Sequence, residues 1–573
     1  MFRGSLSADL CVVGGGLAGM CAAIAAARRG VRTVLVQDRP VLGGNASGEI
    51  RMHICGSRGL LESGLVEEFK LANLARNPYC NYSIWDSVLY EKARFQPNLT
   101  LLLNAGCMDA VVSGAPEARH IASVKVWQLT TYTMYDIEAD YFVDASGDCI
   151  LADPSGAEFR VGHEACAEFN ESIAPPEADR KVMGMSTLIQ FREYPGSRRF
   201  VRPDWANRYP DDDALFRRDH AIAPRQNFWW LEFGGDSEPI ENTERVRDEL
   251  LKAAFGIADH VKNVPGHDSE NWDLDWVGFL PGKRESRRYV GDHIVTEHDV
   301  RGGGKFPDVI AYGGWPLDDH HPAGFHHPGA PTVFHPAPDI FGIPYRSVYS
   351  RNVDNLWMAG RNISVSHVAL SSSRVMGTCA LLGEAVGCAA AVACEYGLSP
   401  REVGRKKLTE LQQMLLDNDC YLPGVEREIA ALCRRAALRS SGSGDAEILR
   451  SGLMREPVWN APEGGWAEYV LPEASEVAEV RIVFDSDLEG RHARRELNMR
   501  PHYPLNHPEA ELPATLVRAY RVTAESADGT VQVLAEETAN SRRLVKIPVG
   551  KALRKIRLEV PERGARVVRF DFR

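Results

Sequence analysis

The sequence lacks closely spaced pairs of cysteines of the CxxC type. Its 12 cysteines are scattered singly along 573 residues, at positions such as Cys11, Cys80 and Cys433, and no two stand three residues apart. This spacing excludes a redox-active dithiol, a zinc ribbon and an iron–sulfur cluster with closely spaced ligands. We interpret the cysteines as reduced thiols in a reducing compartment.

Long apolar runs and an excess of positive charge are also missing. The longest apolar stretches are interrupted by charge or glycine, so we expect no transmembrane span. Residues Met1–Ala8 contain no apolar core of signal-peptide length. The formal net charge of -12 argues against nucleic acid and against a polybasic membrane patch. A cytoplasmic protein with a small-molecule substrate and about two to four domains is the simplest interpretation.

What the sequence does have is a glycine-rich turn between a strand and a helix. The segment Asp9–Val13, apolar after its first residue, continues into Gly14-Gly15-Gly16-Leu17-Ala18-Gly19 and an alanine-rich helix. Gly14 allows a tight turn, Gly16 lets the backbone approach a pyrophosphate, and Gly19 lets the helix lie close to the sheet. The positive end of the helix dipole begins at Leu17 and Ala18, so the pattern predicts a dinucleotide-binding βαβ unit.

The residues after the second strand, 31–36, indicate which dinucleotide binds. They read Gln37-Asp38-Arg39-Pro40-Val41-Leu42-Gly43-Gly44-Asn45. This segment resembles the acid followed by Leu-Gly-Gly in FAD-binding flavoproteins built like glutathione reductase and fumarate reductase. The resemblance implies bound FAD, with an acid closing the second strand and holding the adenosine ribose hydroxyls. Gln37 stands where that acid usually is and Asp38 follows it, so either is a candidate. The resemblance makes the rest of the segment, Arg39, Gly43, Gly44 and Asn45, further candidate contacts.

Polar and reactive residues alternate with small or apolar ones in the next segment. Ser47, Glu49, Arg51, His53 and Cys55 stand two apart, which places them on one side of an extended stretch. In flavoproteins of this architecture the stretch runs beside the ribityl chain and the flavin, so Ser47 and Arg51 are predicted cofactor contacts. His53 and Cys55 are candidates for the flavin's neighbourhood, including covalent attachment. Packing or a supporting hydrogen bond is the alternative.

Two later segments resemble further FAD signatures of these proteins. A strand and an antiparallel meander over 99–143 end at Ala145-Ser146-Gly147, where small residues let the backbone approach the cofactor. A third apolar strand ends at Ala359-Gly360-Arg361, and beyond Arg374 a helix of small residues begins at Gly377. The resemblance implies that this helix points at the pyrimidine end of the flavin, where its dipole and Arg374 favour negative charge.

The region between these signatures is rich in aromatic residues, prolines and histidines, and we interpret it as a substrate domain. Its basic run, 283–288, contains Arg284 and Arg287, which are candidates to orient a substrate. A solvated charged turn is the alternative. The region also contains Trp315–His321, with His326, His327 and His335 beyond it. Because their spacing matches no standard ligand pattern, we expect no metal and interpret the segment as an active-site loop.

The C-terminal part has a different pattern. Two helices, predicted over 401–416 and 425–439, precede a flexible joint at Ser440–Gly444. Beyond the joint, alternating apolar and polar runs predict an all-β sandwich. It resembles a galactose-binding-like jelly roll, which either binds sugars or serves as a lid or dimer surface.

The predicted fold class is therefore α/β. A Rossmann-type FAD-binding domain, whose sheet carries a β-meander insertion, is combined with an inserted α+β substrate domain and a C-terminal all-β sandwich. The predicted domains are residues 1–155 (FAD-binding, first part), 156–350 (substrate or cap), 351–400 (FAD-binding, second part), 401–439 (helical) and 446–573 (sandwich).

The three FAD signatures and the basic run together resemble the bacterial FAD-dependent oxidoreductases often associated with polysaccharide use. The resemblance covers roughly residues 8–430. It implies oxidation of a hydroxyl carbon in a carbohydrate or glycoside, with hydride transfer to flavin N5 and a base that accepts the hydroxyl proton. His367, between the third strand and the helix aimed at the ring, is the first candidate for this base, and His53 is the second. A structural, hydrogen-bonded histidine is the alternative for both.

Two other classes of function stay open. Some FAD proteins act without net redox turnover, as hydratases, isomerases or lyases working through a transient ketone. The chain could instead be a carbohydrate-binding scaffold with a structural flavin. No second GxGxxG with suitable flanks occurs, so no nicotinamide site is expected. The electron acceptor and a homo-oligomeric state are left open.

Overall fold

The computed structural model describes residues 2–222, 226–442, 444–490 and 499–573. The chain divides into two compact units. Unit 1 comprises residues 1–58, 79–408 and 497–510, and unit 2 comprises 59–78, 409–496 and 511–573. These limits differ from the predicted domains, since the boundary after residue 408 falls within the segment 401–439 that was predicted as one helical part. Helix α2 (Leu65–Arg76) belongs to unit 2, whereas the described residues 499–510 belong to unit 1.

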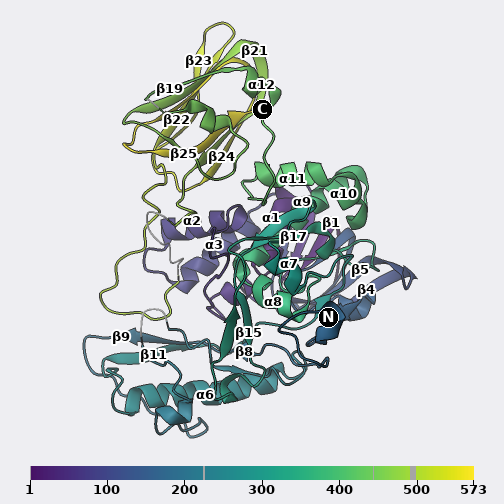
Figure 1. Cartoon of the computed structure of the whole chain (residues 1–573), viewed down its shortest axis with the longest axis vertical. Helices are drawn as coiled ribbons and strands as arrows, with labels where there is room; N and C mark the ends of the chain where they lie inside the picture. The colour runs from purple at the N-terminus through teal and green to yellow at the C-terminus, as the bar shows by residue number, and fades with distance from the viewer. Residues whose placement is uncertain (1, 223–225, 443, 491–498) are drawn as a thin grey trace. The chain divides into compact units, whose positions relative to one another are not determined.

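A seven-stranded sheet forms the centre of unit 1 (Figure 1). Its order is β3 (Leu99–Leu102), β2 (Thr33–Val36), β1 (Phe2–Val13), β6 (Thr133–Asp144), β5 (Ala118–Gln128) and β4 (Ala105–Ala115), and β18 (Leu356–Met358) pairs with β6. Strands β4, β5 and β6 form the predicted antiparallel meander, and the remaining pairs are parallel. The register aligns Leu102, Val36, Val13, Asp144 and Met358. The turns that carry the three FAD signatures therefore all follow the carboxyl ends of these strands, on the same side of the sheet.

Helix α1 (Leu17–Arg28) packs against α9 (Met376–Tyr396). A Cβ at Gly383 would lie 2.0 Å from Ala18 O, and one at Gly387 would lie 2.2 Å from Ala22 O. Small residues thus let the two helix backbones touch. Helix α9 is long and apolar enough to cross a membrane by length and composition, but 94% of its most apolar window is buried inside the protein. The packing accounts for that composition.

The region predicted as a substrate domain combines a long helix with short strands. Helix α6 (Thr243–Asn263) buries Leu250, Ile257 and Val261 in an aromatic core that includes Phe191 and Trp230. The short sheets are β10 (Glu232–Phe233) with β8 (Met185–Ser186) and β12 (Gly282–Lys283), β11 (Trp272–Val277) with β9 (Ile189–Glu193), β13 (Arg288–Tyr289) with β7 (Phe159–Arg160), β14 (Val309–Gly313) with β17 (Phe341–Pro344), and β15 (Leu317–His320) with β16 (Thr332–His335). Further helices of unit 1 are α3 (Tyr82–Arg94), α4 (Ala152–Ser155), α5 (Cys166–Phe169), α7 (Glu297–Arg301) and α8 (His367–Ser373).

The segment predicted to be helical between the domains is helical only in part. Helix α10 (Pro400–Lys406) begins at a capping box formed by Ser399 and Glu402, and α11 (Leu408–Asp417) follows. The prediction of one helix over 425–439 is wrong. Only α12 (Ala431–Arg435) forms, because Ala437–Ser440 instead pair as strand β19 with β21 (Gly465–Phe484). Ser443 of the predicted joint lies outside the described residues.

Unit 2 is built around an antiparallel sheet, as the all-β prediction requires. Its order is β20 (Trp459–Asn460), β25 (Arg566–Phe572), β21, β24 (Leu544–Val560), β22 (Tyr520–Ser526) and β23 (Val531–Glu537), with β19 beside β21. Register shifts at Val470/Ser475 and Val477/Glu479 interrupt the long β21–β24 pairing. Its two halves therefore have different outer neighbours, and their apolar faces share one buried core.

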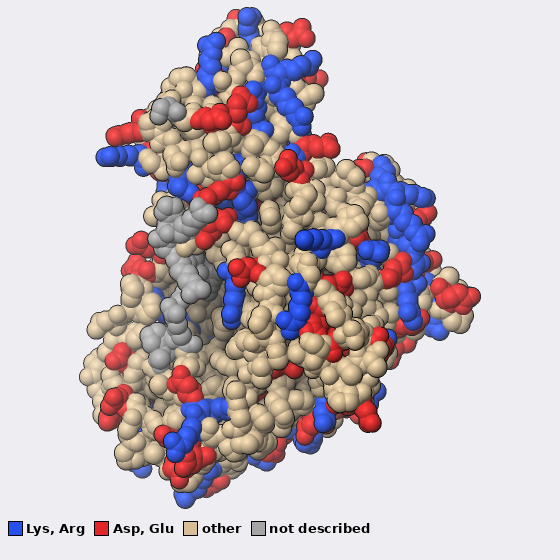
Figure 2. All heavy atoms as spheres, viewed as in Figure 1, with Lys and Arg blue, Asp and Glu red and all other residues tan. Residues whose placement is uncertain are grey.

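The surface carries charge of both signs. Figure 2 shows Lys and Arg interspersed with Asp and Glu over most of the visible face of each unit.

Candidate active site

A cavity of about 1140 Å³ lies where the parallel strands of unit 1 end. Small-molecule sites usually have volumes of about 300–1,000 Å³. The cavity is larger than this, so it has room for a dinucleotide together with a substrate. Most of the predicted cofactor contacts line it: Gly14, Gly16, Leu17, Ala18, Gln37, Asp38, Arg39, Gly43, Gly44, Asn45, Ala145, Ser146, Gly147, Gly360, Arg361 and Arg374.

The glycine-rich turn has the geometry that a pyrophosphate requires. Gly14 has a φ of +105°, and a Cβ there would lie 2.5 Å from the Ala145 carbonyl. At Gly16 a Cβ would meet nothing closer than Gly44 Cα at 3.9 Å, so the backbone is open to the cavity. The N-terminus of α1 has no side-chain cap, which leaves its N–H groups and dipole for an anion.

The two candidates for the ribose have different surroundings. The Gln37 carboxamide is buried, accepts from Gly15 N at 2.7 Å and donates to Val41 O at 3.1 Å. This amide therefore links the glycine turn to the segment that follows the second strand. The Asp38 side chain is 67% exposed and lines the cavity. Its one salt bridge among the described residues is a 3.4 Å contact with Arg39, so its carboxylate is accessible to the ribose hydroxyls.

A second uncapped helix N-terminus, that of α9, reaches the same cavity. Val375 and Met376 line it, and Val375 supplies no side-chain cap. Arg361 and Lys283 flank this region and both pair with Asp148, at 3.0 and 2.8 Å. Burial raises the pKa of Asp148, but the two cations outweigh burial and hold that pKa below its ordinary value.

Four predicted cofactor contacts lie behind the cavity wall. The Arg51 guanidinium stacks on Tyr82 and Trp276, at 4.8 and 4.3 Å from the ring centroids. Ser47 is buried and its N–H donates to Gly44 O, and the Gly377 N–H donates to Cys55 O. A Cβ at Gly19 would lie 1.8 Å from Gly14 O. These four residues lie outside the cavity lining and position the residues that form it.

His53 and Cys55 line the cavity, next to the Asn227 side chain. Asn227 Nδ2 lies 3.3 Å from His53 Nδ1, and Asn227 Oδ1 accepts from Trp229 N at 3.2 Å. The amide that restrains the imidazole is thus itself held in place. The proximity of Cys55 raises the pKa of His53 above its ordinary value, although burial opposes this.

A network of buried charges forms another part of the wall. Arg284 donates to Ser186 Oγ and Trp229 O, each at 2.8 Å, and lies 3.3 Å from Glu232. Glu232 also pairs with His320 Nδ1 at 2.7 Å, and His320 Nε2 lies 3.3 Å from Asp318. Arg284, His320 and Asp318 line the cavity, so the basic run contributes to its wall, and so does the segment 315–321, which was predicted as a loop but forms strand β15 over Leu317–His320.

Asp318 is held ionised by this network. Burial raises its pKa, but hydrogen bonding to His320 and the charge of Arg374 outweigh burial and place that pKa far below its ordinary value. The sequence contained no signal for Glu232, because the residues that it engages are distant along the chain.

Two predicted catalytic residues lie outside the lining. His367 is buried between Glu285, 2.9 Å from Nδ1, and Asp319, 3.3 Å from Nε2. Burial disfavours its charge, but these carboxylates outweigh burial and raise the pKa of His367 to about 10. An imidazole that is protonated at neutral pH cannot accept a proton, so the structure gives no support to His367 as the base. Arg287 pairs with Asp153 at 2.5 Å and stacks on Phe159, away from the lining.

The described residues fit FAD. Two uncapped helix N-termini, a glycine turn open at Gly16 and an accessible carboxylate at Asp38 offer partners for the pyrophosphate, the flavin and the ribose. His53 and the Arg284 network leave polar groups for a substrate in the same cavity. Of the imidazoles that line the cavity in the described part of the chain, His53 is the one without a carboxylate partner.

Three solved structures are similar to parts of the chain. A geranylgeranyl bacteriochlorophyll reductase-like protein of Thermoplasma acidophilum has 14% identity, covering 72% of this chain and 86% of that one, with a TM-score of 0.32. THI4 of Thermovibrio ammonificans has 17% identity, covering 30% and 76%, with a TM-score of 0.22. A family 32 carbohydrate-binding module of Streptococcus pneumoniae EndoD has 15% identity, covering 24% and 94%, with a TM-score of 0.19. At these TM-scores we draw no argument from the likenesses.

A family model settles the identity. The model for FAD dependent oxidoreductases matches residues 9–415, which include most of the sheet, all three FAD signatures and the residues that line the cavity. The chain therefore belongs to the FAD-dependent oxidoreductase family.

Proposed function

We propose that the protein oxidises a hydroxyl-bearing carbon of a carbohydrate or glycoside. The observation that carries this proposal is the lining around His53, which combines aromatic faces with hydrogen-bonding groups. Trp229, Trp276, Trp315 and Phe334 line the cavity together with Arg284, Asp318 and His320. A sugar offers both C–H faces for stacking and hydroxyls for hydrogen bonding, so this mixture suits it.

When bound, FAD supplies a two-electron acceptor whose N5 takes a hydride. His53 accepts the hydroxyl proton on its imidazole, and its contact with Asn227 restrains the ring. Arg284 is already fixed by Ser186 and Trp229, so it offers an oriented charge and pays little further entropy on binding. The ionised Asp318 accepts hydrogen bonds from substrate hydroxyls.

An anaerobic absorbance screen tests the proposal. The purified yellow protein is mixed with sugars, glycosides and uronic acids, and bleaching of the flavin band is followed by stopped flow. We expect a subset of these compounds to bleach the band and to yield the corresponding ketone or aldehyde. A matched series of deoxy sugars, each lacking one hydroxyl, identifies the oxidised carbon because the deoxy compound at that position stays inactive.

Two results would replace the proposal. Product formation without bleaching and without consumption of any electron acceptor would indicate a redox-neutral hydratase, isomerase or lyase. Glycan binding by the full chain with no chemical change in the glycan would indicate a binding protein with a structural flavin.

A further inference from the structure

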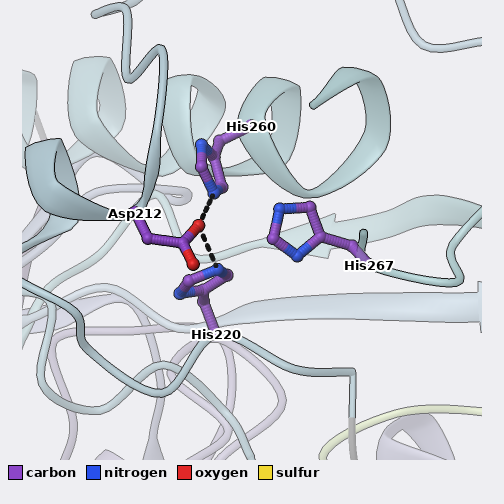
Figure 3. A group of neighbouring side chains, drawn as sticks. All are labelled: Asp212, His220, His260 and His267. Atoms are coloured by element: carbon purple, nitrogen blue, oxygen red, sulfur yellow. Dashed lines mark ion pairs between the residues drawn. The ribbon is translucent and has the colours of Figure 1, made fainter. Parts of the chain in front are cut away.

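Three histidines and an aspartate meet in the substrate region of unit 1, outside the cavity lining (Figure 3). Asp212 lies in the short turn 212–215, His220 in the loop after it, His260 in the last turn of α6 and His267 just beyond that helix. In Figure 3 the three imidazoles surround the Asp212 carboxylate. We propose that these four side chains bind a zinc ion.

The two ligand–ligand distances that involve Asp212 are close to those of a tetrahedral zinc site. One potential ligand atom from each residue lies within 4.8 Å of all the others. Asp212 Oδ1 is 3.3 Å from His260 Nε2 and 3.5 Å from His220 Nε2. In a tetrahedron with zinc–ligand bonds of about 2.0–2.1 Å, neighbouring ligand atoms lie about 3.4 Å apart. The three ring centroids are 4.7, 4.8 and 4.9 Å apart, so the imidazoles are arranged evenly.

The protonation pattern of two rings points to a cation. His260 Nδ1 donates to Tyr209 O at 2.8 Å, and His220 Nδ1 donates to Arg218 O at 2.6 Å. Since a carbonyl only accepts, both Nδ1 atoms carry hydrogen, and neutral rings then present Nε2 lone pairs to the Asp212 carboxylate. Lone pairs that face a carboxylate repel it, and either a second proton on each ring or a metal ion between the groups removes this repulsion. A backbone partner on the outer nitrogen is also the arrangement that orients metal-binding histidines.

Burial strengthens this argument. The His260 side chain is fully buried, and its Nε2 has no hydrogen-bond partner among the described residues; His267 Nε2 likewise has none. A buried nitrogen without a hydrogen-bond partner is unfavourable, and metal ligation would satisfy it. Three imidazoles and a carboxylate are ligands that zinc accepts, whereas calcium and magnesium prefer oxygen.

A metal here would have a structural role. It would tie the turn at 212–220 to the end of α6, two segments about forty residues apart in the sequence. None of the four residues lines the cavity, so zinc loss should lower the thermal stability and leave the flavin in place.

The test measures zinc in the purified flavoprotein. Protein is stripped with a chelator, exposed to zinc chloride, desalted and analysed by inductively coupled plasma mass spectrometry. We expect about one zinc ion per chain, a higher Tm with zinc than with chelator, and an unchanged flavin spectrum. Asp212→Asn and His267→Asn alter the less buried members, so these variants should fold, and each should lose roughly tenfold in zinc affinity. His298→Asn, an exposed histidine outside the cluster, is the control and should bind zinc as the wild type does.

Two outcomes would overturn the proposal. One is wild-type protein that takes up no zinc and whose Tm does not respond to it. The other is zinc uptake that is the same in wild type, Asp212→Asn and His267→Asn, because that would place the metal elsewhere.

Discussion

His367 and Glu285 form a buried ion pair, with Nδ1 2.9 Å from a carboxylate oxygen. Glu285 also pairs with Arg288, and Arg288 pairs with Glu164 at 2.8 Å. Both partners of His367–Glu285 are nearly inaccessible to solvent. This chain of alternating charges explains why His367 is a structural cation, and it joins α8 to the basic run of residues 283–288.

Replacing His367 with Gln should therefore destabilise the protein in a pH-dependent way. Its pKa is about 10 in the folded state and 6.5 ordinarily. Its stabilising charge is fully present below pH 6.5 and is lost as the pH rises through about 10. Breaking a buried pair costs about 3–5 kcal/mol, so we expect a clearly lower Tm near pH 6 and a smaller gap toward pH 10. A gap that stays constant with pH in thermal scans would contradict the protonated pair.

Replacing His53 with Gln should keep the bound FAD but slow its reduction by substrate about 10²–10⁴-fold. As a base, His53 acts when unprotonated, so wild-type reduction should slow as the pH falls through its pKa, which lies above 6.5. The variant should lack this dependence. Stopped-flow reduction across pH measures both effects. His321→Gln, outside the cavity lining, is the control. Equal rates for His53→Gln and wild type would remove His53 from the role.

Replacing Gly19 with Ala should abolish tight FAD binding. The new Cβ would lie 1.8 Å from Gly14 O, so α1 must move away from the turn that it positions. Overpacking of this kind costs about 1–3 kcal/mol and displaces backbone. The ratio of flavin to protein absorbance after purification measures the loss. Gly196→Ala, where a Cβ meets nothing within 4 Å, should retain the wild-type ratio.

Substitutions of Asp38 and Gln37 should have different effects, one on FAD affinity and the other on stability. Asp38→Asn removes an exposed carboxylate, so the apoprotein should keep its Tm while FAD binds about tenfold more weakly, as expected for one charge-assisted hydrogen bond. Gln37→Leu leaves Gly15 N and Val41 O without their partner and should lower the apoprotein stability by about 1–3 kcal/mol. Fluorescence titration with FAD and thermal scans measure the two effects. Unchanged FAD affinity in Asp38→Asn would remove it as the ribose partner.

The fold class and the cofactor could be predicted from the sequence because their signals are local. A glycine turn between a strand and a helix specifies its own geometry, as Gly14 and Gly16 show. Alternating apolar residues likewise predicted the strands of unit 2. The helix expected over 425–439 failed because Ala437–Ser440 gain a partner strand that lies thirty residues further along the chain.

Only the tertiary structure decided which side chains are charged and which residues lie together in one site. From the sequence, His367 was the first candidate for the base and His53 the second. Burial beside Glu285 makes one a fixed cation, and the cavity leaves the other accessible to substrate. Likewise, Asp212 and His260 stand far apart in the sequence, and no spacing pattern joins them. Packing of α6 against the preceding loop brings them to 3.3 Å, because long-range contacts depend on how the whole core closes and not on neighbouring residues.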